Sequence, residues 1–402
     1  VSRALVKRAY KYRFYPTEQQ RHELLRTFGC VRLVYNKALD ARTAAWYTEQ
    51  RRVSYVQASA MLTEWKNTDE LAFLSEVSSV PLQQCLRHLQ RAFTNFFDNR
   101  ANYPRFKSRK KSRASAEYTR SAFTWRDGNV TLAKMSEPLN IVWSRPLPEG
   151  ARPSTVTVSC DAARRWFVSI LVKTTVDHHP RSTAAVGVDA GIESLMTLST
   201  GEKITNPRHE RRDRERLVKA QRELARKRKG SANRAKARLN VARIYAKITD
   251  RRRDYLHKIT TRLVRENQTI VIEDLNVSGM VKNGNLARAI SDASWTQLRL
   301  MLEYKASWYG REVIVVDRWF PSSKMCSECG TLVDTVPLDV REWTCRCGTS
   351  HDRDVNAAKN IVAAGLAVAA CGGSARPTRR ESVRQLSMKQ ETQPVRVGIP
   401  RL

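Results

Sequence analysis

The sequence has no long apolar run and few acidic residues for its number of basic ones. Its longest apolar stretch, residues 361–370, is about half of the roughly 20 residues that a membrane-spanning helix needs. The start of the chain does not show a basic segment followed by an apolar one, which is the pattern of a secretory signal. We therefore expect a soluble, cytoplasmic protein with no membrane partner.

Cysteine is scarce outside one segment. The chain has eight cysteines in 402 residues, and four of them stand alone among apolar neighbours or near the end. Isolated cysteines are typical of reduced thiols in a reducing compartment, which excludes a small secreted domain held by disulfides. These four residues are Cys30, Cys85, Cys160 and Cys371.

The other four cysteines form two close pairs separated by fifteen residues, and each pair is followed by glycine. This spacing is typical of a tetrahedral four-cysteine zinc site, which is structural because no position stays open for water. Redox-active or unrelated cysteines are the alternative. His351 follows the second pair, and we interpret it as a polar residue at a domain junction rather than as a ligand. The predicted Zn²⁺ ligands are Cys326, Cys329, Cys345 and Cys347.

Basic residues greatly outnumber acidic ones. The 72 Lys and Arg against 39 Asp and Glu give a net charge of +33 and a pI near 10.4. Such a surplus repels itself in a compact fold, and nucleic acid is the polyanion that most often neutralises it. We therefore expect a nucleic-acid partner and, in a prokaryote, association with the nucleoid. Basicity alone does not indicate catalysis, because histone-like and ribosomal proteins share it.

Two segments carry much of this charge. Residues 208–253 contain 19 Lys or Arg and five acids, in helical stretches broken at Gly230-Ser231. They predict helices that line a nucleic-acid channel, with a solvated basic face as the alternative. Residues 103–113 predict a loop that contacts phosphates, again with a solvated charge run as the alternative. The candidate contacts in this loop are Arg105, Lys107, Arg109, Lys110 and Lys111.

The first 180 residues switch between strand and helix patterns. Residues 5–15 alternate aromatic and basic side chains, which predicts a strand, and residues 117–176 predict several more. Between them, Thr17-Glu18-Gln19-Gln20 has the spacing of a capping box at the start of helical material. We expect a small β-barrel or sheet formed by residues 1–15 and 116–180, with a helical domain, residues 16–115, inserted into it.

Three acids stand at the ends of elements in the second half. Asp189 follows one apolar strand, Glu273 ends another, and Asp354 begins a helix with a small apolar face. Asp274 and Asp352 are the competing choices. The predicted order is strand, hairpin, strand, helix, strand, helix, strand, helix. This order matches the ribonuclease H-like fold, in which two central strands and the last helix bring three carboxylates together.

Crowded carboxylates repel one another unless cations occupy the site. Hard oxygen ligands select Mg²⁺ or Mn²⁺, and two such ions can activate water and stabilise the leaving oxygen of a phosphodiester. The pattern therefore predicts a metal-dependent nuclease in which Asp189, Glu273 and Asp354 are both the catalytic residues and the ligands of Mg²⁺ or Mn²⁺.

Several segments together resemble the TnpB family of insertion-sequence-encoded proteins, which is ancestral to compact type V CRISPR nucleases. They are FYPTEQQ, YPRFKSRK, GVDAG, VIEDLNVSGM, SWTQLRLMLEYKASWYG, RWFPSSKMCSECG and CGTSHDRDVNAAKNI, and the resemblance spans residues 4–366. It implies a multidomain α+β protein whose N-terminal wedge β-barrel carries an inserted helical recognition bundle. A RuvC-like nuclease domain, residues 181–318 and 351–368, is interrupted by a zinc ribbon, residues 319–350. Residues 369–402 are expected to form a disordered basic tail.

By the same resemblance, the protein is an RNA-guided DNA endonuclease and a monomeric ribonucleoprotein. Its guide RNA comes from the transposon end, and it cuts target double-stranded DNA next to a short motif. The resemblance assigns catalysis to Asp189, Glu273 and Asp354. The alternatives are a guided but nuclease-inactive DNA-binding regulator and an unguided RuvC-like nuclease or transposase accessory protein. A structural basic zinc-ribbon protein is the last alternative.

Overall fold

The computed structural model describes residues 3–110, 112–333 and 340–370. Residues 5–176 and 216–247 form one compact unit, and the remaining described residues form a second. Lys111 and the predicted tail from residue 371 onward lie outside the described residues. None of the described helices combines the length and the apolar character needed to span a bilayer.

The first unit is built on a five-stranded sheet in the order β2-β6-β7-β1-β5, with β2 and β5 at its edges. The pairs β2–β6, β6–β7 and β1–β5 are antiparallel. A separate hairpin turns at Asp127-Gly128, where both residues have positive φ, as a two-residue hairpin turn requires. The strands are β1 (Arg3–Phe14), β2 (Ala114–Thr119), β3 (Phe123–Arg126), β4 (Asn129–Leu132), β5 (Ile141–Val142), β6 (Pro153–Cys160) and β7 (Trp166–Asp177).

Helices occupy the chain between β1 and β2, as the sequence predicts. Thr17 and Gln20 form the predicted capping box, in which each side chain bonds the other residue's backbone N–H. Phe14 of β1 and Leu24 of α1 are both 0 % exposed and belong to one core cluster, so the helices pack against the sheet. The elements are α1 (Glu18–Glu49), α2 (Tyr55–Lys66), η1 (Asp69–Ser75), α3 (Ser79–Phe97) and η2 (Arg120–Ala122).

The second unit contains a mixed five-stranded sheet in the order β10-β9-β8-β11-β12. β8, β11 and β12 run parallel, whereas β9 is antiparallel to both β8 and β10. The hairpin β8–β9–β10 and the later alternation of helices and strands confirm the predicted order of elements. The strands are β8 (Ala185–Asp189), β9 (Ser194–Leu198), β10 (Lys203–Thr205), β11 (Thr269–Glu273) and β12 (Glu312–Val316).

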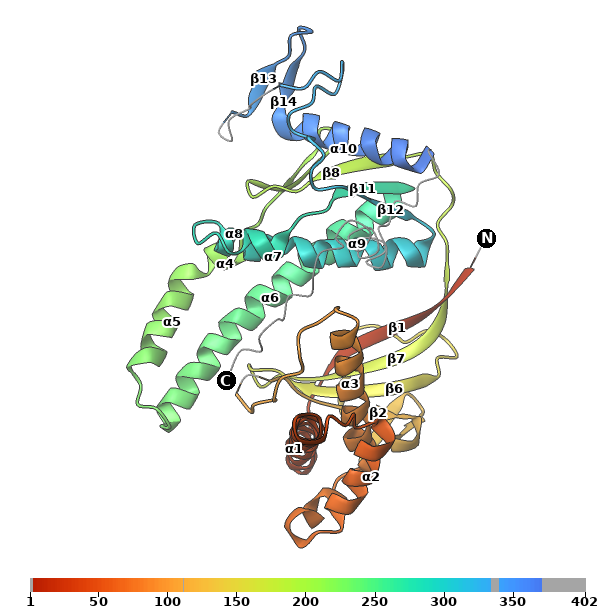
Figure 1. Ribbon diagram of the computed structural model, residues 1–402, viewed down its shortest axis with the longest axis vertical. Helices are drawn as coiled ribbons and strands as arrows, with labels where there is room; N and C mark the ends of the chain where they lie inside the picture. The colour runs from red at the N-terminus through yellow and green to blue at the C-terminus, as the bar shows by residue number, and fades with distance from the viewer. Residues whose placement is uncertain (1–2, 111, 334–339, 371–402) are drawn as a thin grey trace. The chain divides into compact units, whose positions relative to one another are not determined.

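Helices cover both faces of this sheet (Figure 1). On one face, the C-terminal half of α6 and α9 pack against alternate residues of the strands, such as Ile270. On the other face, Ile361 of α10 packs against Val271. Each buried Ile or Val of this kind contributes about 1.5–3 kcal/mol to folding. The helices that follow β10 along the chain are α4 (His209–Arg212), α5 (Arg214–Arg226), α6 (Ala232–Glu266), α7 (Val277–Met280), α8 (Ala287–Ala293), α9 (Trp295–Tyr309) and α10 (Arg353–Ala370), of which residues 216–247 belong to the first unit.

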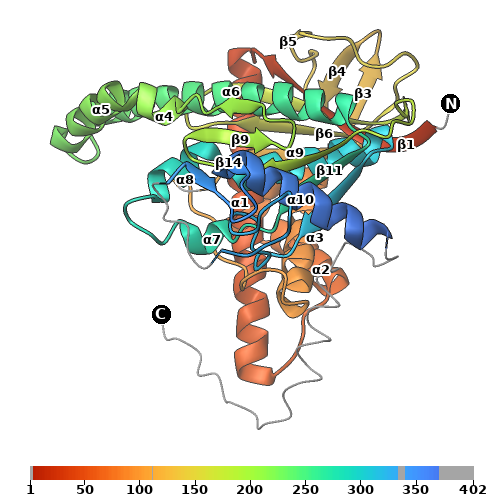
Figure 2. The same cartoon turned by 90° about the horizontal axis from the view of Figure 1, so that it is seen from above.

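The predicted break at Gly230-Ser231 separates α5 from α6, and Gly230 has a φ of 88°. The two helices form an antiparallel hairpin (Figure 1), and they overlap in the view of Figure 2. Arg234 closes the hairpin, because its guanidinium donates to the carbonyl oxygens of Leu224 and Lys227 at 2.7 and 2.8 Å. The basic segment is thus helical, as predicted.

α10 approaches the sheet closely at two glycines. A Cβ on Gly187 would stand 2.0 Å from the carbonyl oxygen of Ala358, and a Cβ on Gly365 would stand 2.4 Å from Cγ1 of Val271. α10 also continues to Ala370, so the predicted tail boundary at residue 369 is wrong by two residues. Residues 361–370 are apolar throughout, so no change in the sequence marks residue 369 as the end of the helix.

A small segment separates β12 from α10. Met325 and Leu332 form an isolated bridge, and β13 (Glu342–Thr344) pairs antiparallel with β14 (Ser350–Asp352). The two predicted cysteine pairs lie beside these short pairings. Residues 334–339 of this segment lie outside the described part of the chain.

Candidate functional site

Two parallel strands bring Asp189 and Glu273 to the same level. Val188 of β8 is paired with Ile272 of β11, so the next residues of the two strands are Asp189 and Glu273. The carboxyl ends of neighbouring parallel strands lie at one edge of a sheet. The two acids therefore stand side by side at that edge.

The third acid, Asp354, is brought to the same edge by α10. Gly187 and Val271 contact α10, and residues two positions further along a strand point the same way. Asp189 and Glu273 are those residues, and Asp354 lies in the first turn of α10. The structure thus brings the three predicted acids together on one face.

The environment of Asp189 and Glu273 opposes their ionisation. Burial, together with the charges of Glu273 and Asp354, raises the pKa of Asp189 to about 7. Burial also raises the pKa of Glu273, although Ser322 Oγ donates a 2.6 Å hydrogen bond to its Oε1. A site of this kind is suited to a bound cation, which would favour the charged forms of all three carboxyls.

Asp274, the first competing acid, is already neutralised by arginine. Its Oδ1 accepts a hydrogen bond from Arg299 at 2.8 Å, and its Oδ2 accepts one from Arg318. Although partial burial opposes ionisation, these two bonds lower the pKa of Asp274. The charge of Asp274 is therefore compensated by two arginines of the protein itself.

Asp352, the second competing acid, caps α10. Its Oδ1 accepts from the backbone N–H groups of Asp354 and Val355 at 3.1 and 3.0 Å, and its Oδ2 lies 2.6 Å from Lys203 Nζ. Despite partial burial, Lys203 and the Val355 N–H lower the pKa of Asp352. Asp352 thus orients the helix that carries Asp354.

Among the described residues, the ion pair of Asp354 is a long one with Arg341. Arg341 lies 3.7 Å from Asp354 Oδ1 and 2.8 Å from Glu193 Oε2, and its side chain is 53 % exposed. An exposed pair of this kind contributes about 0–1 kcal/mol. The carboxylate of Asp354 is therefore available to another cation.

The four predicted cysteines converge. Cys326 Sγ lies 3.8 Å from Cys347 Sγ, and Cys329 Sγ lies 3.6 Å from Cys345 Sγ. Zn–S bonds of about 2.3 Å in a tetrahedron place the sulfurs about 3.8 Å apart, so the cluster fits zinc. Among the described residues, these are the metal-ligating side chains whose ligand atoms all lie within 4.8 Å of one another. The three carboxylates interact through their charges, but their oxygen atoms do not all lie within 4.8 Å of one another.

Two turns of similar design hold the cysteines. In the first, the N–H of Cys326 donates to the carbonyl of Thr331 and that of Gly330 donates to the carbonyl of Cys326, both at 2.9 Å. Cys345, Gly348 and Thr349 repeat these bonds at the same distances. Gly330 and Gly348 both have a positive φ, a conformation that glycine adopts without strain because it has no Cβ. Hydrogen bonds with Thr331 lower the pKa of Cys329 to about 6.

His351 is tied to the cysteine cluster. Its Nε2 lies 3.0 Å from Cys326 Sγ, its ring contacts Trp343 at 4.9 Å, and the residue is 6 % exposed. The sequence indicated a polar residue at a junction, and the structure adds a hydrogen bond to the cysteine sulfur.

Two buried asparagines connect α10 to the cysteine segment, and the sequence reasoning missed both. Asn356 and Asn360 each donate to the carbonyl of Met325, at 2.7 and 2.6 Å, and Asn360 also donates to that of Ser322 at 2.8 Å. Polar residues four apart on an otherwise small apolar helix face were the available signal. They bind α10 to the residue that precedes Cys326.

The predicted phosphate-contacting loop has no helix or strand, as expected. Arg105, Arg109 and Lys110 are exposed. Lys107 is half-buried, its Nζ lies 3.8 Å from the centre of the Tyr35 ring, and burial lowers its pKa. The ammonium of Lys107 therefore contributes to packing within its own unit, whereas the other three cations face solvent.

Three family models match the chain. Residues 169–284 match OrfB_IS605, described as "Probable transposase", and residues 295–361 match "Cas12f1-like, TNB domain". Residues 6–51 match a "Helix-turn-helix domain", although this stretch forms β1 and the single long helix α1.

Relatives of similar length extend these matches. A "Putative RNA-guided DNA endonuclease" of Streptomyces pristinaespiralis is 72% identical over 99% of both chains. The "Putative RNA-guided DNA endonuclease InsQ" of Escherichia coli K12 is 34% identical over 93% of this chain and 96% of its own. Among solved structures, the cryo-EM structure of a Cas12f1–sgRNA–target DNA complex matches with a TM-score of 0.55 and 12% identity, covering 89% of this chain and 99% of that one. The last match concerns the fold alone.

Proposed function

This chain belongs to the family of RNA-guided DNA endonucleases, and from that premise we propose how it acts. It binds a transposon-derived guide RNA as a monomeric ribonucleoprotein. The guide directs it to double-stranded DNA next to a short motif, and the protein cuts the DNA by metal-dependent phosphodiester hydrolysis. The net charge of +33 supports this proposal, because base pairing with a guide leaves the protein to hold the nucleic-acid backbone.

The single observation that carries the nuclease mechanism is the contrast among five acids. Asp274 and Asp352 are each neutralised by a cation of the protein at 2.8 Å or less. The other three acids lie together, and within the described residues their shortest ion pair is the 3.7 Å contact between Arg341 and Asp354. This unpaired charge supports a divalent-cation site at Asp189, Glu273 and Asp354.

These three carboxylates would hold Mg²⁺ or Mn²⁺. When bound, such ions activate water and stabilise the charge on the leaving oxygen of a phosphodiester. The rest of the chain holds the carboxylates in place. Ser322 fixes one oxygen of Glu273, the parallel strands fix Asp189, and the cap at Asp352 fixes the turn that carries Asp354.

The four cysteines would hold a structural Zn²⁺, and their sulfur–sulfur distances support this assignment. A four-sulfur site leaves no position for water, so the zinc would stabilise folding rather than act on substrate. The segment that carries it, residues 319–350, is the proposed zinc ribbon.

The domain assignment follows the strands and helices. The sheet formed by residues 1–15 and 116–180 is the proposed wedge domain, and the helices of residues 16–115, inserted between β1 and β2, form the proposed recognition domain. The mixed sheet of residues 181–318, together with α10 in residues 351–368, is the proposed RuvC-like nuclease domain.

The test is to sequence the RNA that co-purifies with the protein after expression with its native downstream DNA. We expect one discrete RNA with a constant scaffold and a 3′ end that extends into flanking sequence. The assembled complex should then cut matched DNA with Mg²⁺ and stop when EDTA is added. Heterogeneous RNA fragments, together with cleavage of structured DNA by the protein alone, would indicate an unguided nuclease instead.

A further inference from the structure

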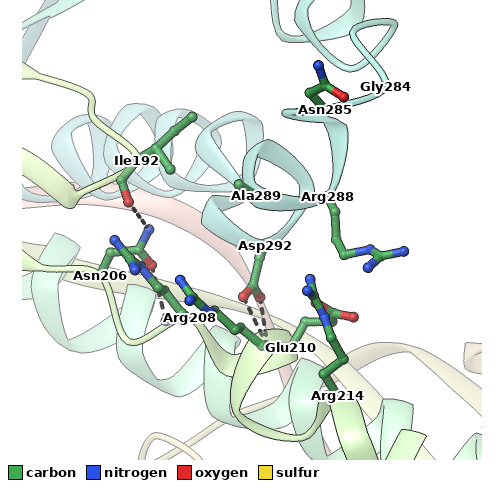
Figure 3. Close-up of a pocket in the computed structure, with 11 residues that line it drawn as sticks. Ile192, Asn206, Arg208, Glu210, Arg214, Gly284, Asn285, Arg288, Ala289 and Asp292 are labelled. Atoms are coloured by element: carbon green, nitrogen blue, oxygen red, sulfur yellow. Dashed lines mark hydrogen bonds and ion pairs between the residues drawn. The ribbon is translucent and has the colours of Figure 1, made fainter. Parts of the chain in front are cut away.

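A hollow of about 540 Å³ lies in the second unit beside α8 (Figure 3). Its walls come from the loop after β8, from the stretch between β10 and α5, and from α8 with the loop before it. Its size is in the range of ligand-binding sites, but its lining is strongly basic. Its charged residues are Arg208, Glu210, Arg211, Arg214, Arg288 and Asp292.

Three of the four arginines have no partner. The side chains of Arg208, Arg211 and Arg288 make no hydrogen bond or ion pair within the part of the chain that the structure describes. Arg214 makes one long bond, 3.4 Å to Glu210. Guanidinium groups gathered at one hollow repel one another unless an anion neutralises them.

The two acids of the hollow do not neutralise all four arginines, because within the described chain Glu210 pairs with Arg214 alone and Asp292 is already bound by other groups. Asp292, which is 9 % exposed, accepts the backbone N–H of Glu210 at 3.0 and 3.2 Å and also binds Arg252 at 2.6 Å. Figure 3 shows Asp292 surrounded by Arg208, Arg214 and Arg288. The hollow therefore keeps a positive surplus at its opening.

Hydrogen bonds hold the backbone of the wall that carries Arg208. Arg208 has a φ of 45°, in the left-handed region that arginine rarely adopts. Asn206 holds this conformation, because its Oδ1 accepts the N–H of Arg208 at 3.2 Å while its Nδ2 donates to the carbonyl of Ile192 at 2.8 Å. Strain retained in this way is characteristic of ligand sites.

The hollow is lined by the loop that follows Asp189. Ile192, which lines it, is the third residue after Asp189. The next residue, Glu193, pairs with Arg341, which also reaches Asp354. A ligand in the hollow therefore lies along the short loop that leaves the candidate catalytic edge.

We propose that this hollow binds phosphodiester groups of the DNA strand that is being cut. One guanidinium group can bind two oxygens of a phosphate at once, and such contacts do not depend on the base sequence. The position beside Asp189 favours the substrate strand over the guide RNA. The arginines hold that strand so that its scissile phosphate reaches the carboxylates. This inference rests on the proposed function.

The test uses the full-length protein with Arg211→Ala and Arg288→Ala, because both residues are exposed and neither change removes a contact of the fold. Arg181→Ala is the matched control. Arg181 is also exposed and without a described partner, but it precedes β8, whereas the hollow follows β8. Each variant is first checked by thermal unfolding, and Arg288→Lys asks whether charge alone suffices.

Binding of a labelled single DNA strand is measured by anisotropy at several salt concentrations, and guide-RNA affinity by filter binding. We expect each hollow variant to weaken strand binding about tenfold and to lower its salt slope by about one, while guide affinity changes less than twofold. Arg288→Lys should recover part of the loss. In the assembled complex, cleavage should fall at low DNA concentration and recover at saturation.

Two outcomes would overturn the inference. An equal loss in Arg181→Ala would show a general charge effect, and a loss of guide affinity with unchanged strand binding would assign the hollow to RNA. A wild-type complex that never cuts guided DNA would instead contradict the proposed function. The strand-binding measurement would still decide the role of the hollow.

Discussion

Gly187 of β8 lies directly against Ala358 of α10, where any Cβ on Gly187 would stand 2.0 Å from the Ala358 carbonyl oxygen. Asp189 is two residues further along the strand, and Asp354 is one helical turn before Ala358. The contact between the two backbones therefore sets how far apart these two carboxylates stand.

Gly187→Ala should push α10 away from the sheet. Overpacking of this kind costs about 1–3 kcal/mol of unfolding free energy, and we expect cleavage to fall at least about tenfold as Asp354 moves. Denaturant unfolding and single-turnover cleavage measure the two effects. Gly29→Ala is the control, because Gly29 lies within α1 and has nothing within 4 Å of its Cβ position, so the change should be neutral or stabilising. Wild-type cleavage by a folded Gly187→Ala protein would contradict the expectation.

Glu273→Gln and Asp274→Asn form a matched pair of adjacent changes. The first removes a charge that accepts a hydrogen bond from Ser322, and the second removes a charge bound by Arg299 and Arg318. We expect Glu273→Gln to lower single-turnover cleavage roughly 10⁴-fold, as loss of a catalytic group does, with little change in guided DNA binding. Asp274→Asn should instead lower the unfolding free energy and leave most cleavage in place. The reverse result would make Asp274 the catalytic acid.

Ser322→Ala tests the orientation of Glu273. The lost hydrogen bond to a carboxylate corresponds to about 1.5–3 kcal/mol, so cleavage should fall roughly tenfold or more while the protein stays folded. Ser327→Ala is the control from the same segment, since Ser327 Oγ is buried without a hydrogen-bond partner. Equal cleavage by the two variants would remove Ser322 from the site.

Removal of zinc should affect the carboxylates through α10. Asn356 and Asn360 bind the carbonyl of Met325, which precedes Cys326, so loss of the cysteine turns releases the N-terminal part of the helix. We expect one zinc per chain by mass spectrometry, and chelation or Cys329→Ser should lower Tm and reduce cleavage at least roughly tenfold. Cys160→Ser, which changes a cysteine outside the cluster, should keep its zinc. Full cleavage by zinc-free protein would show that the two sites are independent.

The sequence predicted those parts of the fold and site that depend on local patterns. Asp354 was preferred to Asp352 because it shares a helix face with Ala357 and Ala358, and the structure places those two alanines in the core. The four cysteines have a spacing that is typical of a zinc site and uncommon in other kinds of site. In each case the chemistry and the local geometry lie within one short stretch.

The remaining features depend on contacts between distant stretches, which no local pattern encodes. Ser322 reaches Glu273 across 49 positions of sequence, and the arginines of the hollow come from segments about 80 positions apart. Lys107 looks like its basic neighbours in sequence, but the Tyr35 ring of α1 lies against its ammonium. Such pairs become visible only when the fold is known.

Among the described elements of the sheet unit, α10 is the last to leave the ribosome. Until residues 353–370 emerge, the face of the sheet that carries Gly187 and Val271 stays uncovered and the third carboxylate is missing. The basic helices α5 and α6 are complete much earlier. A gene copy interrupted upstream of α10, by a stop codon or a frameshift, would therefore encode a nucleic-acid-binding fragment without the means to cut. A single late mutation is enough to separate recognition from cleavage in descendants of this gene.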